Sequence, residues 1–144
     1  MQLQGTRKLS ANPQAVWAAL HNGTVLQNCV PGAEQVTWQG DSAVTALLNV
    51  GIGPFKGQGG ITAQAAESAA PSHIKLVFNR KGAHNSAEGS LTVDLAPEGT
   101  GTLLSYSCNA TIGGMAAALD NPLTRPLVDQ QLGKFFERLD EQVR

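Results

Sequence analysis

The feature that most constrains the fold of this chain is the strict alternation of small or apolar residues with polar residues along positions 85–96. Successive side chains of a β-strand point to opposite faces of the sheet, so this period of two indicates one covered and one solvated face. The covered face would carry Ala87, Gly89, Leu91, Val93 and Leu95. Sheets with one solvated face are mostly antiparallel, and we therefore predict an antiparallel sheet.

Six further segments alternate in the same way and complete a predicted sheet of seven strands. They are residues 1–9, 33–39, 42–50, 55–66, 73–79 and 102–112. Turn-forming residues lie between them, at Gly40-Asp41, at 51–54, at 70–72 and at 97–101, and residues 80–84 are expected to form a loop. Links this short join neighbouring strands as hairpins, and the natural twist of such a sheet lets it curl.

Two short helices are predicted between the first and second strands. Asn12 can cap the first of them, and Pro13 fits the first helical position, where a missing N–H costs nothing. Asn22-Gly23 ends this helix, and residues 24–29 form the second. The run Val30-Pro31-Gly32 then breaks the helical pattern.

The end of the chain has the pattern of one long amphipathic helix. Leu132, Phe135, Phe136, Leu139 and Val143 fall at helical spacing, with charged residues between them. Such a stripe must be buried against another element, and the covered face of the sheet is available. We expect Pro122 and Pro126 to break or kink the approach to the helix, with a shorter helical piece at 115–119.

These elements predict an α+β fold, in which a curved seven-stranded antiparallel sheet wraps around the long C-terminal helix. A length of 144 residues suits a single domain spanning 1–144. Hydrophobic residues make up 42% of the chain, which excludes a disordered protein.

Charge and hydropathy exclude several classes of function. The net charge is −1, and the basic residues are scattered, so no stripe exists that could neutralise nucleic-acid phosphates. No apolar run approaches the ~20 residues of a transmembrane helix, and residues 1–20 lack the pattern of a signal peptide. We therefore expect a cytoplasmic protein that binds no nucleic acid.

The sequence predicts no metal site, no cofactor and no catalytic residue. His21, His73 and His84 are far apart, and Cys29 and Cys108 lack the close spacing of a zinc or redox pair. We interpret both cysteines as small, partly buried hydrophobic residues. Glycines at 51–57 suggest a phosphate loop, but they lie between strands rather than before a helix, and a hairpin turn is the better interpretation.

Several segments of the chain together resemble one protein family. The more specific are Cys29-Val30-Pro31-Gly32 and the glycine-rich stretch 50–57. On these residues the chain resembles the CoxG family, the G subunit of carbon monoxide dehydrogenase, within the Bet v 1/START-like (SRPBCC) superfamily of helix-grip folds. The likeness spans essentially the whole chain and includes residues 12–17, 25–34, 87–89, 102–106, 112–116 and 135–138.

This resemblance implies an accessory role and an apolar cavity. The partner would be a CO dehydrogenase or related molybdenum hydroxylase, and the role assembly, recruitment to the membrane or electron transfer to quinone. Longer relatives carry a C-terminal tail that reaches the membrane, whereas this sequence ends at Arg144, where the predicted helix ends. We therefore expect at most a peripheral position at the inner face of the membrane, without direct attachment.

The composition of the sheet is consistent with such a cavity. Many inward positions are small, and the chain has only two tryptophans, one tyrosine and four phenylalanines to fill the space between sheet and helix. The predicted ligand-binding residues are Leu76, Phe78, Leu91, Val93, Leu104, Tyr106, Cys108 and Phe135, with Gly51, Gly53 and Phe55 as a lip. A closed core of interdigitated Leu and Val side chains is the alternative. Within a cavity, Tyr106 would orient the polar end of a ligand or donate its hydroxyl to a backbone carbonyl.

Three functions are compatible with these features of the sequence. The first is a non-catalytic carrier that holds a lipid or quinone and docks on a larger enzyme. The second is an enzyme, such as a cyclase or hydrolase, that acts on an apolar substrate in the same cavity, with Tyr106 as its one candidate group. The third is a docking domain without a ligand, which requires an exposed apolar patch. The sequence does not indicate an oligomeric state.

Overall fold

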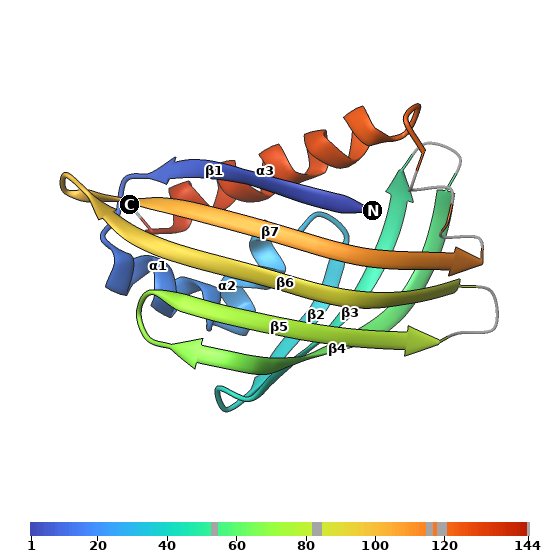
Figure 1. Cartoon of the computed structure of the whole chain (residues 1–144), viewed down its shortest axis with the longest axis horizontal. Helices are drawn as coiled ribbons and strands as arrows, with labels where there is room; N and C mark the ends of the chain where they lie inside the picture. Colours follow the sequence, from blue (N-terminus) through green and yellow to red (C-terminus); the bar gives the residue numbers. More distant parts are fainter. Residues whose placement is uncertain (53–54, 82–84, 115–116, 118–120, 144) are drawn as a thin grey trace.

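The computed structural model has the predicted order of elements: one strand, two short helices, six strands and a long helix (Figure 1). It describes residues 1–52, 55–81, 85–114, 117 and 121–143, with backbone only at 50–52, 55–57, 81 and 85. The elements are β1 (Gln2–Leu9), α1 (Pro13–Leu20), α2 (Gly23–Cys29), β2 (Ala33–Gln39), β3 (Ala43–Ile52), β4 (Phe55–Ala69), β5 (His73–Lys81), β6 (Asn85–Glu98), β7 (Gly101–Gly114) and α3 (Arg125–Val143).

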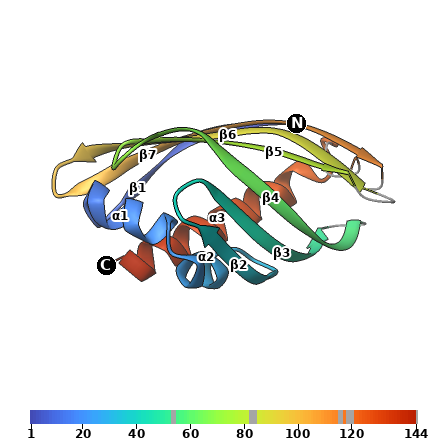
Figure 2. The ribbon, with the colours of Figure 1, turned by 90° about the horizontal axis from the view of Figure 1, so that it is seen from below.

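The seven strands form one antiparallel sheet in the order β1-β7-β6-β5-β4-β3-β2. Each strand from β2 to β7 pairs with its neighbour in sequence, and β1 closes the far edge against β7. Figure 2 shows the sheet arched over the three helices, with β2 and β3 curling round toward α2. This arrangement confirms the predicted helix-grip fold.

Asparagine caps start both short helices. The side-chain oxygen of Asn12 accepts a hydrogen bond from the Ala15 N–H at 2.9 Å. The side-chain oxygen of Asn22 accepts from the N–H groups of Thr24 and Val25, at 3.0 and 3.2 Å. These bonds satisfy backbone donors that the first turn of a helix leaves unpaired. The second helix therefore begins directly after Asn22, one residue earlier than the pattern predicted.

Several strands are longer than the sequence predicts. The turn expected at 51–54 is shorter, because Gly51 pairs with Lys56 and Ile52 with Phe55. Strand β5 continues through Lys81 into the expected loop. The turn expected at 97–101 shrinks to two residues, since Glu98 pairs with Gly101. Its first residue, Gly99, has φ +60°, the conformation that a two-residue hairpin with glycine in first place requires.

The proline-rich approach to the last helix differs in part from the expectation. Pro126 is the second residue of α3 and lies in its first turn, where proline removes no intrahelical hydrogen bond. It therefore starts the helix and does not kink it. Pro122 precedes the helix, as expected. The helical piece predicted at 115–119 lies outside the described residues, apart from Ala117.

The hydrophobic core lies where the short helices and α3 meet the sheet. Its most buried members come from six different elements: Leu9, Val16, Ala19, Cys29, Leu95, Leu104, Phe136 and Leu139. Buried Thr102 is satisfied there, because its hydroxyl donates to the carbonyl of Ala11 at 2.8 Å. This core fixes the position of α3 against the sheet and leaves space farther along the inner face.

Candidate functional site

A cavity of about 250 Å³ lies between the inner face of the sheet and the helices. Its wall is built from the ends of α1 and α2, from strands β2, β3, β5, β6 and β7, and from the middle of α3. The surface that faces the cavity is apolar. The lining residues are Leu20, His21, Leu26, Val30, Trp38, Val44, Ile74, Leu76, Leu91, Val93, Leu104, Tyr106, Leu132, Phe135 and Phe136.

Six of the eight residues predicted to bind a ligand lie in this wall: Leu76, Leu91, Val93, Leu104, Tyr106 and Phe135. Phe78 and Cys108 do not. Phe78 lies one inward position beyond Leu76 on β5 and borders a separate shallow hollow with Glu88 and Asn109. Neither residue is part of the described wall. Whether the six residues bind a ligand stays a prediction.

Two of the three residues predicted to form a lip at the cavity lie in paired strands rather than in a turn. Gly51 and Phe55 belong to the paired ends of β3 and β4, and Gly53 lies outside the described residues. Their role at the cavity stays a prediction.

The structure adds an aromatic stack that the sequence patterns did not place at the site. His21 lies between Trp17 and Trp38, with ring centroids 4.4 and 4.5 Å away. The indole N–H of Trp38 donates to the carbonyl of Leu20 at 3.0 Å, which ties β2 to the end of α1. The spacing of Trp17 and His21, four residues apart on a helix, was the available signal, since such residues face the same side.

Tyr106 lies in the cavity wall, but with different contacts from those expected. Its ring packs against Phe136 at 5.3 Å between centroids, and its hydroxyl lies over Gly5 of β1. A side chain at Gly5 would meet this hydroxyl at 2.8 Å, so the glycine makes room for the tyrosine. Among the described residues, the expected hydrogen bond from Tyr106 to a backbone carbonyl is not formed.

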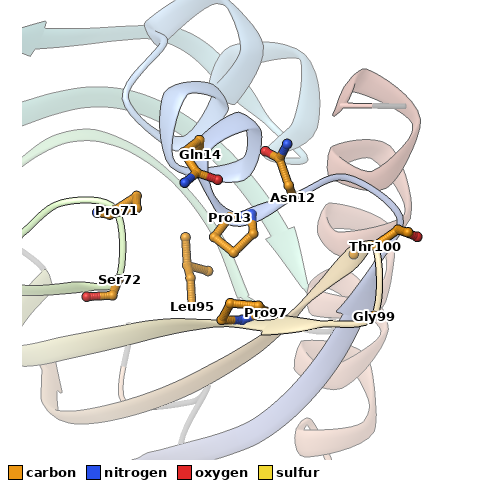
Figure 3. A pocket seen from close by; sticks show the side chains of 10 residues that line it. Asn12, Pro13, Gln14, Pro71, Ser72, Leu95, Pro97, Gly99 and Thr100 are labelled. Atoms are coloured by element: carbon orange, nitrogen blue, oxygen red, sulfur yellow. The ribbon is translucent and has the colours of Figure 1, made fainter.

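A second hollow, of about 420 Å³, lies at the surface between the start of α1 and two hairpin turns. Figure 3 shows Pro13, Pro71 and Pro97 around Leu95 at this place. Asn12, at its edge, already uses its side-chain oxygen to cap α1. The inner cavity is therefore the better candidate for binding a small molecule, because it is enclosed by apolar side chains of the sheet and the helices.

Comparison with protein families supports the resemblance seen in the sequence. The family model that describes CoxG, the G subunit of carbon monoxide dehydrogenase, matches residues 5–144. The chain belongs to the CoxG family. A search of curated proteins found no significant match.

Solved structures share the fold of this CoxG-family chain. A conserved protein from Geobacillus kaustophilus has a TM-score of 0.87 at 24% identity, with 99% of this chain and 95% of that chain covered. A START superfamily protein from Mycobacterium smegmatis has a TM-score of 0.73 at 15% identity, covering 99% and 96%. An AHSA1-like protein from Aeromonas hydrophila has a TM-score of 0.68 at 14% identity, covering 99% and 93%. At these identities the likeness shows a START-like fold.

The state of the two cysteines agrees with their interpretation as small, partly buried hydrophobic residues. Both cysteines are free, and burial raises the pKa of the Cys29 and Cys108 thiols. A raised thiol pKa favours the unreactive protonated form. Within the described ranges, no three His, Cys, Asp or Glu side chains cluster as metal ligands. In the same part of the chain, no helix is long and apolar enough to span a membrane.

A histidine on the outer face of the sheet bridges two carboxylates. Nδ1 of His73 lies 2.6 Å from Asp94, and Nε2 lies 3.1 Å from Glu67. The hydrogen bonds to Asp94 and then to Glu67 raise the pKa of His73 above its ordinary 6.5. The charged imidazole thus ties β5 to both of its neighbours.

We expect the stability of the protein to fall as pH rises through the raised pKa of His73. A group whose pKa is higher in the folded state stabilises that state fully below its unfolded pKa of 6.5, and the contribution is lost above the folded pKa. Urea unfolding at about pH 6 and about pH 9 measures this change. The variant His73→Gln should lose less unfolding free energy between these two pH values than the native protein does. Equal pH dependence in both proteins would contradict the role of the bridge.

Proposed function

We propose that this protein is a non-catalytic accessory protein, which holds an apolar ligand, a lipid or quinone, in its inner cavity and assists a CO dehydrogenase or related molybdenum hydroxylase. Membership of the CoxG family supports the partner. The apolar cavity supports the ligand. Assembly of the enzyme, its recruitment to the membrane and electron transfer to quinone are the roles open to such a protein. We propose a cytoplasmic location, which for the last two roles includes a peripheral position at the inner face of the membrane.

The observation that carries this proposal is the apolar wall of the cavity. Ligand pockets are lined mainly by hydrophobic and aromatic side chains, with few polar groups. The described lining fits this composition, since its polar side-chain atoms belong to His21, Trp38 and Tyr106. The volume of about 250 Å³ is slightly below the ~300–1,000 Å³ of typical ligand sites. It suits a ring system or a segment of chain, so a longer ligand must extend beyond it.

An enzyme acting in the same cavity is less well supported. Acid–base or nucleophilic catalysis needs a titratable group, usually held by a second group that orients or activates it. Tyr106, the group predicted for catalysis, lies in the wall, and so does His21, but no carboxylate, lysine or cysteine joins His21 among the described lining residues. The hydrogen-bond partner of its Nδ1 is the backbone carbonyl of Trp17, which cannot relay a proton. A single histidine of this kind suits binding better than turnover.

Native mass spectrometry of the purified protein, followed by organic extraction, tests the proposal. We expect an adduct of defined mass that is released into organic solvent as a lipid or quinone. Purification from cells that contain a molybdenum hydroxylase tests the partner, which should be retained with the protein. A protein that carries nothing, and that takes up neither added quinones nor fatty acids, would overturn the carrier function in favour of a docking domain.

A further inference from the structure

One buried side-chain polar atom in the cavity wall has no hydrogen-bond partner among the described residues. Nε2 of His21 is buried and forms no hydrogen bond with the described residues. The ring belongs to the cavity wall, and its two faces are covered by Trp17 and Trp38. Buried polar atoms almost always have a hydrogen-bond partner, because an unpaired one loses its hydration and gains nothing in exchange. An unpaired nitrogen at a ligand-sized cavity therefore points to a partner that comes from the ligand.

The other nitrogen of the ring determines what this partner must be. Nδ1 of His21 lies 2.9 Å from the carbonyl oxygen of Trp17. A carbonyl oxygen can only accept, so Nδ1 must carry a proton. When the ring holds one proton, Nε2 is the bare nitrogen and presents a lone pair. It can then bind a hydrogen-bond donor.

We propose that His21 is the polar anchor of the cavity, and that its Nε2 accepts a hydrogen bond from a hydroxyl group on an otherwise apolar ligand. This inference rests on the proposed function and narrows its ligand class. Phenols, reduced quinones and long-chain alcohols carry such a hydroxyl, whereas oxidised quinones and esters offer only acceptors. Because Nε2 is buried and the surface that faces the cavity is apolar, a neighbouring side chain of the wall must move aside for the hydroxyl to reach Nε2.

The aromatic stack makes His21 a suitable anchor. Trp38 is fixed by its bond to Leu20, and the backbone N–H of His21 itself donates to Trp17 at 3.1 Å. The imidazole therefore has little freedom to turn and satisfy Nε2 elsewhere. A ring with one proton could donate to a ligand carbonyl only with that proton on Nε2, and it would then lose its bond to Trp17. The geometry thus discriminates between donor and acceptor ligands.

A matched pair of probes tests this discrimination by calorimetric titration: 2-naphthol, which can donate, and 2-methoxynaphthalene, which cannot. We expect the native protein to bind 2-naphthol about tenfold more tightly. In His21→Phe, which keeps an aromatic ring in the stack but lacks Nε2, this ratio should fall to about one with 2-methoxynaphthalene affinity retained. The control is His73→Phe, on the outer face of the sheet, which should leave the ratio of the two probe affinities unchanged.

A second measurement does not depend on the folding of a variant. The ¹⁵N chemical shifts of the His21 imidazole in the native protein distinguish a protonated nitrogen from a bare one. We expect a bare Nε2, and a change in its shift on addition of 2-naphthol but not of 2-methoxynaphthalene. Equal affinity of the native protein for both probes, or a proton on Nε2, would overturn the inference alone. Failure of both probes to bind would also overturn the inference, whereas the proposed function falls only if added quinones and fatty acids fail to bind as well.

Discussion

Replacing Leu139 by alanine is expected to destabilise the protein by about 3 kcal/mol, within the ~2–5 kcal/mol range for large-to-small changes in cores. Leu139 on α3 is fully buried and packs in the core with residues of β1 and α1. Removing its branched end leaves a void where the helix meets both the sheet and the short helices, and these elements cannot all close on it. Urea unfolding of the native and variant proteins measures the difference.

The same substitution at an exposed leucine is the control. Leu123, just before α3, is 86% exposed, so Leu123→Ala should change the free energy of unfolding by no more than ~0.5 kcal/mol. An equally small effect at Leu139 would mean that the C-terminal helix does not pack against the inner face of the sheet. The position of the cavity depends on that helix, because Leu132, Phe135 and Phe136 form one side of its wall.

Filling the cavity is expected to abolish most ligand binding without unfolding the protein. Leu76 points into the cavity from β5, and Leu76→Trp would place a larger ring in a space of about 250 Å³. We expect the affinity for 2-methoxynaphthalene, measured by calorimetry, to fall at least tenfold, because probe and indole would compete for the same volume. The melting temperature should change little, since the new ring enters existing space.

The neighbouring residue provides a matched control. Val77 follows Leu76 on the same strand, but its side chain points to the outer face and is 37% exposed. Val77→Trp should therefore leave the affinity for 2-methoxynaphthalene unchanged. If both variants bind as the native protein does, the probe binds outside the cavity. If Leu76→Trp loses its thermal transition, the smaller change Val93→Leu would serve the same purpose in the same wall.

Stability and binding depend on different parts of one inner surface. The densest packing lies where α1, α2 and the C-terminal part of α3 meet the sheet, at Val16, Cys29 and Leu139. The cavity extends from this core along the inner face, past Val93 and Leu76. There the side chains of the sheet and of α3 do not fill the space between them. Variants can therefore affect one property with limited effect on the other.

Local signals in the sequence were sufficient to predict the order and type of the elements. Alternation along 85–96, the cap Asn12 and the apolar stripe of the last helix depend on residues close together in the chain. They predicted a curved antiparallel sheet gripping a helix. Strand ends were less accurate, since a ladder continues as long as backbone partners align, as Ile52 and Phe55 do, whatever the local composition.

Six of the eight residues predicted to bind a ligand do lie in the cavity wall, because inward-facing positions follow from the period of the strands. The sequence could not show that Phe78 and Cys108 lie outside the described wall, or that His21 and Trp38 belong to it. These facts depend on how far the sheet curls and on which end of it the short helices cover. The unpaired Nε2 of His21 is the clearest case, because an atom lacks a partner only by virtue of everything packed around it.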